Sequence, residues 1–223
     1  MTNTSRSFTL RIQFESRLRV KRMENYYGAW NIRGGCLEYF DDTHTYLYDG
    51  VILPSVTQII RLKFGHKYDG VPSYVLQRAS QNGTAVHSAI ERYCKFGEDS
   101  ELQELYNFKF LQDHYGFKVL ENEIPIVLFD EGSPVCAGRL DLVLEQDGKT
   151  GLGDIKRTYT LDKEYLAYQL NLYRLAYQQC YGNKIEFLKG VHLRGDKRQY
   201  VDIPINEEMA WDLVKEWRTK NEH

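Results

Sequence analysis

The stretch that decides the fold is residues 137–156, AGRLDLVLEQDGKTGLGDIK, which is typical of two strands joined by a tight turn. The dipeptide Asp147-Gly148 is a strong signal for a two-residue hairpin turn between such strands. With that turn, Gln146 pairs with Lys149. Because the turn fixes the register of a hairpin, every other pair in it follows.

This register places charges of like sign opposite each other. Asp141 falls opposite Asp154, and Arg139 falls opposite Lys156. Residues two apart share one face of a strand, so we expect these four residues, called the charged quartet below, on one face. Like charges directly opposed are destabilising, but a divalent cation relieves two carboxylates and a phosphate suits two cations. The quartet thus indicates a site where a metal ion and a phosphate meet. The alternative is an exposed hairpin with scattered charges.

The rest of the chain supplies further elements. The other face of the hairpin is expected to carry Leu140, Leu142, Leu144 and Ile155. Turn signals and hydrophobic patterns predict a hairpin, five helices and five strands. These are a hairpin at 37–53, a short helix after its N-cap Ser55, helices near 83–94, 100–115, 161–181 and 206–219, and strands near 118–129, 135–145, 151–158, 185–193 and 198–204. This order predicts an α/β fold with a mixed central β-sheet flanked by helices and a small N-terminal hairpin/helix region.

Composition limits the classes of protein that fit. The chain of 223 residues has a net charge of −2, so nucleic-acid binding would depend on local basic patches. The four cysteines lack the spacing of a zinc or redox motif and are interpreted as reduced. No apolar run is long enough for a membrane span, and the N-terminus lacks the apolar core of a signal peptide. We therefore expect a cytoplasmic protein without a membrane partner.

The first 33 residues are basic, with seven Lys and Arg against two acids. They are interpreted as an extension, with Met23 as an alternative start, followed by a single domain at 34–223. A nucleic-acid-binding arm is the competing interpretation.

Two helical motifs add candidate residues. His87 and Glu91 are four apart, so they share a helix face. A lone histidine such as His87 is more often a packed or surface residue than a ligand. It becomes a candidate ligand only if it lies beside the hairpin. Glu91 is a candidate to bond the ring nitrogen of His87 that does not bind the metal and so to orient the ring, although an ordinary surface glutamate fits the pattern as well. Gln169 and Tyr173 share a face of the later helix, and a buried amide there needs a partner such as a phosphate or base.

Together these pieces resemble the PD-(D/E)XK nuclease superfamily, specifically its RecB-like exonuclease branch with phage-encoded members. The family has four motifs in a fixed order, G-T-x-x-H, G-x-x-D, D-x-K and Q-x-x-x-Y. Here they match residues 83–87, 138–141, 154–156 and 169–173. Residues 44–57 also resemble the start of phage members. The resemblance implies a restriction-endonuclease-like core of order αβββαβ.

The resemblance also implies a site. A divalent cation, Mg²⁺ or Mn²⁺, would be held by His87, Asp141, Asp154 and the backbone carbonyl of Ile155, with Lys156 positioning water or balancing charge in the transition state. Asp141, Asp154 and Lys156 form the implied catalytic set. DNA contacts are expected from Arg139, Gln169 and Tyr173. Some members hold an iron–sulfur cluster on one upstream cysteine and three near the C-terminus. No cysteine follows Cys180, so no cluster is expected.

The expected function is metal-dependent exonuclease action on linear DNA from its ends, in phage or prophage DNA processing or recombination. A single-strand annealing or recombination protein is a candidate partner. The alternatives are a structure-specific endonuclease on the same fold and an inactive DNA-binding recombination scaffold. Loss of Asp154 or Lys156 would favour the scaffold, and both are present.

Overall fold

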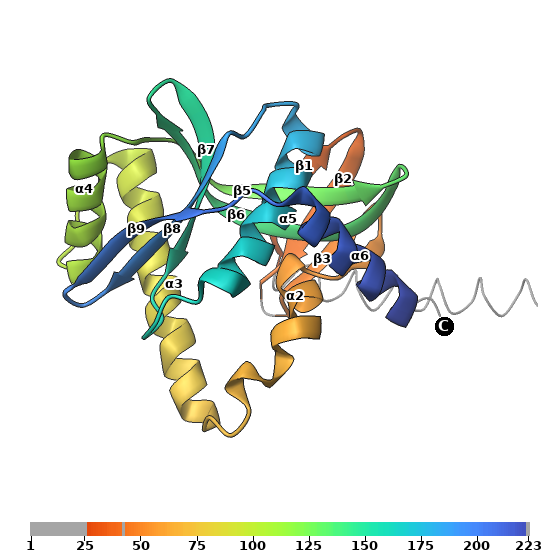
Figure 1. Cartoon of the computed structure of the whole chain (residues 1–223), viewed down its shortest axis with the longest axis horizontal. Coiled ribbons are helices and arrows are strands. Elements are labelled where there is room, and N and C mark those ends of the chain that lie inside the picture. Colours follow the sequence, from red (N-terminus) through yellow and green to blue (C-terminus); the bar gives the residue numbers. More distant parts are fainter. Residues whose placement is uncertain (1–25, 42, 222–223) are drawn as a thin grey trace, which may run out of the picture.

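The computed structural model describes residues 26–41 and 43–221, which form two β-sheets and a set of helices that pack against the larger sheet (Figure 1). The N-terminal sheet is antiparallel and has the strand order β1-β2-β3-β4. Its strands are β1 (Tyr26–Ile32), β2 (Gly35–Phe40), β3 (Thr45–Tyr48) and β4 (Val51–Leu53). The hairpin predicted at 37–53 thus belongs to a larger sheet. Part of the predicted extension forms β1, and residues 1–25 lie outside the described residues.

The central sheet has five strands in the order β5-β6-β7-β8-β9. They are β5 (Lys118–Asp130), β6 (Ser133–Gln146), β7 (Lys149–Lys156), β8 (Phe187–Arg194) and β9 (Lys197–Ile203). β7 and β8 are parallel and the other neighbours are antiparallel. The mixed central sheet predicted from the sequence is confirmed.

The β6–β7 hairpin has the predicted register. Pairs run from Gln146–Lys149 to Leu142–Gly153. Asp147 and Gly148 have φ values of +54° and +74°, as a two-residue turn of this kind requires. The paired ladder ends one step before Asp141 and Asp154, where the predicted site begins.

Helices cover both faces of the central sheet (Figure 1). They are α2 (Val56–Phe64), α3 (Ser73–Phe96), α4 (Gln103–Tyr115), α5 (Lys163–Tyr181) and α6 (Glu207–Asn221), with a 3₁₀ turn, η1 (Gly65–Tyr68), after α2. One core cluster joins α2, α5 and α6 to the sheet, and a second joins α3 and α4 to it. Ser55 caps α2 as predicted, in a capping box with Gln58. No helix in the described part of the chain is long and apolar enough to cross a membrane.

Two predictions about these elements are wrong. The helix expected near 83–94 begins ten residues earlier, at Ser73. Residues 71–81 are all exposed, so the first turns of this helix bury no face within the described part of the chain. Leu140 was expected to share a face with Leu142, Leu144 and Ile155. It packs instead in the cluster of α2, α5 and α6, while the other three pack against α3 and α4. The alternation of β6 is therefore interrupted at Asp141.

Candidate functional site

The site lies at the open end of the β6–β7 hairpin. Asp141 and Asp154 are both buried there, with 8% and 1% of their surface exposed. The backbone N–H of Ile155 donates to Asp141 Oδ2 at 2.7 Å. This bond ties the Asp141 side chain to β7 beyond the last paired residues, which brings it beside Asp154.

Helix α3 delivers His87 to the same place. Its Nδ1 lies 3.5 Å from Asp141 Oδ1 and 3.7 Å from Glu123 Oε1. Its Nε2 lies 3.2 Å from the Ile155 carbonyl oxygen. The structure thus brings His87, Asp141 and the Ile155 carbonyl together, as the sequence motifs predicted.

Glu123 on β5 belongs to this group, and the sequence analysis missed it. Its neighbours Asn122 and Ile124 pair with Leu142 and Leu140, so Glu123 stands opposite Asp141. Its side chain is 9% exposed, and its φ is +54°, unusual for a residue other than glycine. One donor atom each from His87, Glu123 and Asp141 lie within 4.8 Å of one another. We call His87, Glu123, Asp141 and Asp154 the acid cluster.

A register shift between β5 and β6 is the reason that the position of Glu123 cannot be predicted from the sequence. The two-residue turn Glu131-Gly132 is a recognisable signal, and Asp130 pairs with Ser133 across it. Carried along the strands, that register would place Glu123 opposite Leu140. A bulge between Leu128 and Phe129 moves the pairing by one residue.

Each cation near the site is paired with an acid. Arg139 Nε lies 2.5 Å from Glu123 Oε2, and the Lys156 ammonium forms an ion pair with Asp154 Oδ2. The prediction that Arg139 and Lys156 face each other across the hairpin is therefore wrong. The paired ladder stops before them, and Glu123 supplies the acid that the sequence pattern lacked.

Helix α5 closes the site with Gln169 and Tyr173. Both are buried, and Gln169 Nε2 donates to Tyr173 Oη at 3.2 Å. A Cβ at Gly138 would lie 3.1 Å from Tyr173 Cε1, which is why a glycine suits this position. Burial raises the pKa of Tyr173, and the charges of Asp154 and Asp141 add to the effect. Their contact with DNA stays a prediction.

Glu91 does not take the role that its spacing suggested. Its carboxylate bonds Lys95 on the same helix at 2.6 Å. Both ring nitrogens of His87 have other partners, Ile155 on one side and the two carboxylates on the other. Glu91 is therefore not the residue that orients His87.

The pKa values show that buried carboxylates crowd together at the site and act on the groups around them. Burial works against a charged imidazole, but the carboxylates of Asp141 and Glu123 raise the pKa of His87 to about 9. Burial, with the charges of Asp154 and Glu123, raises the pKa of Asp141 above its ordinary range. Burial opposes the charge of Lys156 too, but Asp154 and Asp141 outweigh it and raise its pKa. The neighbouring carboxylates thus favour the protonated form of His87, which lies between Asp141 and Glu123.

The acid cluster fits a divalent metal ion. Asp154 Oδ1 and Gln169 Oε1 are buried acceptors without a hydrogen-bond partner among the described residues, and Asp154 Oδ2 has only the ion pair with Lys156. Unsatisfied buried acceptors of this kind are costly. Carboxylate oxygens suit Mg²⁺, and one imidazole nitrogen suits softer ions such as Mn²⁺.

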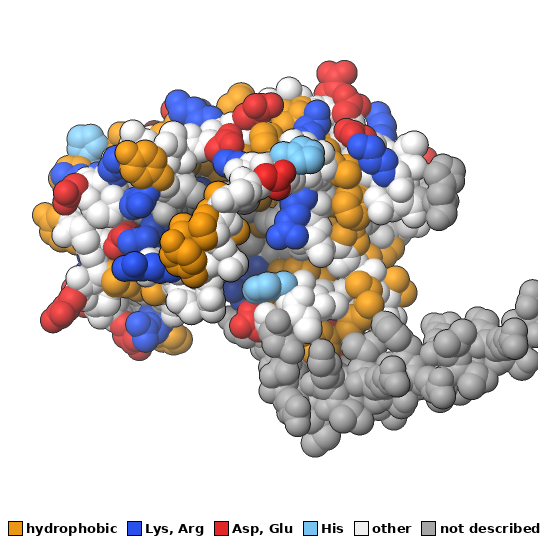
Figure 2. All heavy atoms as spheres, turned by 90° about the horizontal axis from the view of Figure 1, so that it is seen from below, with side chains coloured by type: hydrophobic (Ala, Val, Ile, Leu, Met, Phe, Trp, Pro, Cys, Tyr) orange, Lys and Arg blue, Asp and Glu red, His pale blue; other side chains and the backbone are white. Residues whose placement is uncertain are grey.

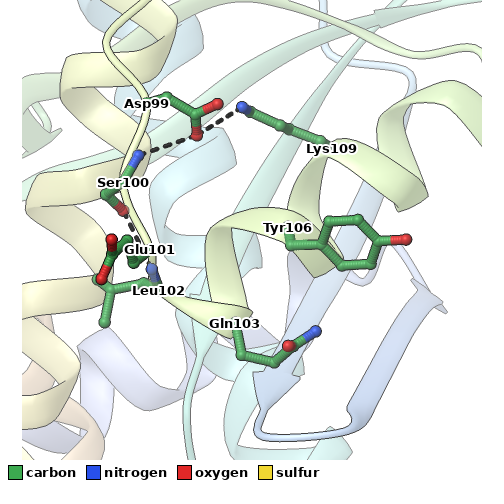
Figure 3. A pocket seen from close by; sticks show the side chains of 7 residues that line it. All are labelled: Asp99, Ser100, Glu101, Leu102, Gln103, Tyr106 and Lys109. Atoms are coloured by element: carbon green, nitrogen blue, oxygen red, sulfur yellow. Dashed lines mark hydrogen bonds and ion pairs between the residues drawn. The ribbon is translucent and has the colours of Figure 1, made fainter.

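A larger surface hollow offers no comparable chemistry. It has a volume of about 550 Å³ and is lined by the loop that precedes α4 and by the first turns of α4 (Figure 3). Two of its charged side chains bond each other, because Asp99 accepts from Lys109 at 2.7 Å, and Asp99 also accepts from the Ser100 N–H at 2.9 Å. The acid cluster therefore remains the candidate site.

Comparisons with known proteins identify no family. No family model matches the chain, and no curated protein matches it. One of the solved structures that match, described as the crystal structure of SSO0001, has 17% sequence identity and a TM-score of 0.44. The match covers 76% of this chain and 76% of that one. So distant a likeness says nothing about activity.

Proposed function

We propose that the protein is a divalent-metal-dependent DNA exonuclease of the RecB-like branch of the PD-(D/E)XK nucleases, acting in phage or prophage DNA processing. The observation that carries the proposal is the acid cluster at the end of the β6–β7 hairpin, with unpartnered buried acceptors and a lysine beside it. Four sequence motifs of that family meet at this one place.

The residues have distinct roles in this proposal. His87, Asp141, Asp154 and the Ile155 carbonyl hold the cation, and Glu123 extends the donor set. A bound divalent cation supplies Lewis-acid chemistry toward a phosphate oxygen. Lys156 lies on the Asp154 side of the cluster, where it balances the charge that develops on the phosphate.

The surrounding groups keep this arrangement in place. Arg139 holds Glu123 in position through their ion pair. Tyr173 packs over Gly138, and Gln169 donates a hydrogen bond to its hydroxyl group. Because they are already bonded and packed, these side chains cost little to organise when a substrate arrives.

Preference for DNA ends follows from the family resemblance, and the test must separate ends from internal sites. The purified protein should be incubated with an end-labelled linear duplex and with a covalently closed circle, in Mg²⁺, Mn²⁺ or EDTA. We expect the linear DNA to be degraded with either metal, the circle to persist, and EDTA to stop the reaction.

Two outcomes contradict the proposal. Activity that survives exhaustive chelation would remove the metal from the reaction. Rapid cutting of the closed circle would show an endonuclease. Asp212→Asn, a change to an exposed carboxylate on α6, is the matched control for any acid-cluster variant.

A further inference from the structure

A second polar groove lies on the same face of the central sheet as Lys156. Lys156 pairs with His192 on β8, and His192 pairs with Gln199 on β9. Directly paired residues share a face, so these three form one row across the sheet. The row ends in a groove of about 370 Å³, lined by residues 159–161, His192 and residues 196–199. The groove therefore begins one strand away from the lysine of the proposed site.

The floor of this groove holds an unsatisfied polar atom. His192 is 2% exposed, and its Nε2 bonds the Thr158 carbonyl oxygen at 2.8 Å. That bond makes Nε2 the protonated nitrogen and leaves Nδ1 as an acceptor. Nδ1 is buried and has no hydrogen-bond partner in the described part of the chain. A ligand that donates a hydrogen bond would satisfy it.

The rim of the groove carries two cations around an exposed aromatic ring. Tyr159 is 73% exposed, and Arg194 and Lys197 lie 5.0 and 4.6 Å from its ring centre. Within residues 26–41 and 43–221, neither cation forms an ion pair with a carboxylate. By contrast, nearby Arg157 is neutralised by Glu104 at 2.8 Å. Figure 2 shows basic side chains beside hydrophobic ones on the side of the molecule where β9 and α4 lie.

We propose that this groove binds the single-stranded DNA segment next to the scissile phosphate. Arg194 and Lys197 contact the phosphates, and His192 Nδ1 accepts from a base amino group. Sites for single strands combine cations that follow the backbone with aromatic side chains. Tyr159 is three residues after Lys156, so their backbones are at most about 10 Å apart, the length of about three stacked nucleotides. This inference rests on the proposed nuclease function, because it takes Lys156 to lie at the scissile phosphate.

The test is binding of a labelled single-stranded oligonucleotide of about twelve nucleotides to the full chain in EDTA, followed by fluorescence anisotropy over a range of salt. Arg194→Gln with Lys197→Gln should raise Kd at least about fivefold. The slope of log affinity against log salt should fall by about 1.4, because two phosphate contacts are lost. The control, Lys215→Gln with Lys220→Gln on α6, removes the same charge from an exposed helix and should change Kd less than about twofold.

A third variant separates the acceptor from the cations. His192→Asn should raise Kd without changing the salt slope, because the proposed contact of His192 is to a base and not to a phosphate. Since His192 is buried, this variant could fail to fold, and the variant of Arg194 and Lys197 then decides the case. Equal weakening by the groove and control variants would overturn the proposal. The proposal would also be overturned if a mononucleotide, at the same concentration of phosphate groups, displaced the oligonucleotide.

The two proposals fail in different ways. Groove-dependent binding without any metal-dependent degradation would refute the nuclease and leave the groove as a strand-binding site. Normal binding and degradation by the Arg194/Lys197 variant would refute the groove alone.

Discussion

Two buried carboxylates in this molecule have opposite surroundings. Glu104 on α4 is 5% exposed, and its Oε1 accepts from Arg157 Nε at 2.8 Å and from the Gly195 N–H at 3.3 Å. Asp154 on β7 is 1% exposed, and its Oδ1 has no partner among the residues that the structure describes. The first carboxylate fastens α4 to the β7–α5 loop and the β8–β9 turn. The second is paired with Lys156 through Oδ2, but its buried Oδ1 lies unpartnered beside the other carboxylates of the acid cluster.

The pKa values express the same contrast. Burial opposes the charge of Glu104, but hydrogen bonds from its own backbone and from Gly195, with Arg157, lower its pKa. In the acid cluster, burial and neighbouring carboxylates raise the pKa of Asp141. Glu104 has one cation and backbone donors to itself, whereas the carboxylates of the acid cluster are crowded together and raise one another's pKa. This difference is the reason for proposing a function for the cluster and a structural role for Glu104.

The largest expected effect is on DNA cleavage. Asp154→Asn keeps the volume of the side chain but removes a proposed metal ligand, so turnover should fall at least about a hundredfold. The turnover of Lys156→Ala should fall by a similar factor, because this change removes the cation proposed to balance charge on the phosphate. Glu104→Gln should stay within a few-fold of the unaltered protein. Initial rates on end-labelled linear DNA measure all three, and full activity in Asp154→Asn would make the D-x-K match a coincidence.

For the free energy of unfolding, Glu104→Gln should have a larger effect than Asp154→Asn, the reverse of their order for cleavage. Glu104→Gln removes the charge that satisfies Arg157 and should lower the free energy of unfolding by about 1–3 kcal/mol. Asp154→Asn removes the partner of Lys156 but also relieves repulsion on Asp141, so in the metal-free protein its loss of stability should be smaller than that of Glu104→Gln. Urea denaturation in EDTA gives both values. A metal-free Asp154→Asn variant that unfolds would mean that the cluster is structural.

The pH dependence of stability should also differ between the two regions. The pKa of His87 is raised from 6.5 to about 9, so its stabilisation of the metal-free fold is complete below about pH 6.5 and is lost as pH rises through about 9. The loss should be about 1–2 kcal/mol, because the cluster is partly open to solvent. Glu104 has a lowered pKa, so its contribution is present above its ordinary value of 4.5 and is lost on acidification.

Denaturation midpoints in EDTA from pH 6 to 10 should show the alkaline loss. His87→Gln should flatten that part of the curve, and Glu104→Gln should not. If the alkaline loss of stability were unchanged in His87→Gln, the titration of His87 would not be its cause.

The smallest effect concerns the packing of Tyr173. Gly138→Ala places a methyl group 3.1 Å from the Tyr173 ring, so the ring must shift by a few tenths of an ångström. We expect a stability loss of about 1 kcal/mol and a few-fold loss of cleavage. Gly83→Ala on α3 has open space around it, and should be neutral or stabilising by about 0.5–1 kcal/mol. Thermal melts and cleavage rates check both, and equal effects at the two positions would contradict the role given to Gly138.

The sequence predicts most of the fold and part of the site, for physical reasons. Asp147-Gly148 fixes a hairpin register by local geometry, so the positions of Asp141 and Asp154 could be foreseen. Glu123 could not, because its place depends on a bulge that no residue pattern announces. The start of α3 was missed since its first turns bury nothing. Arg139 was misplaced for a second reason, because the pairing of β6 with β7 stops at Leu142 and Gly153.

The central claim is that the acid cluster, unlike Glu104, is a divalent-cation site. The most direct test is the thermal stability of the protein titrated with Mn²⁺ and Mg²⁺. Binding to the native state at one hundred times Kd adds about 2.7 kcal/mol, so the melting temperature should rise by several degrees in the unaltered protein and equally in Glu104→Gln. The rise should be lost in Asp141→Asn and Asp154→Asn. An equal rise in these two variants, or no rise in the unaltered protein, would contradict the claim.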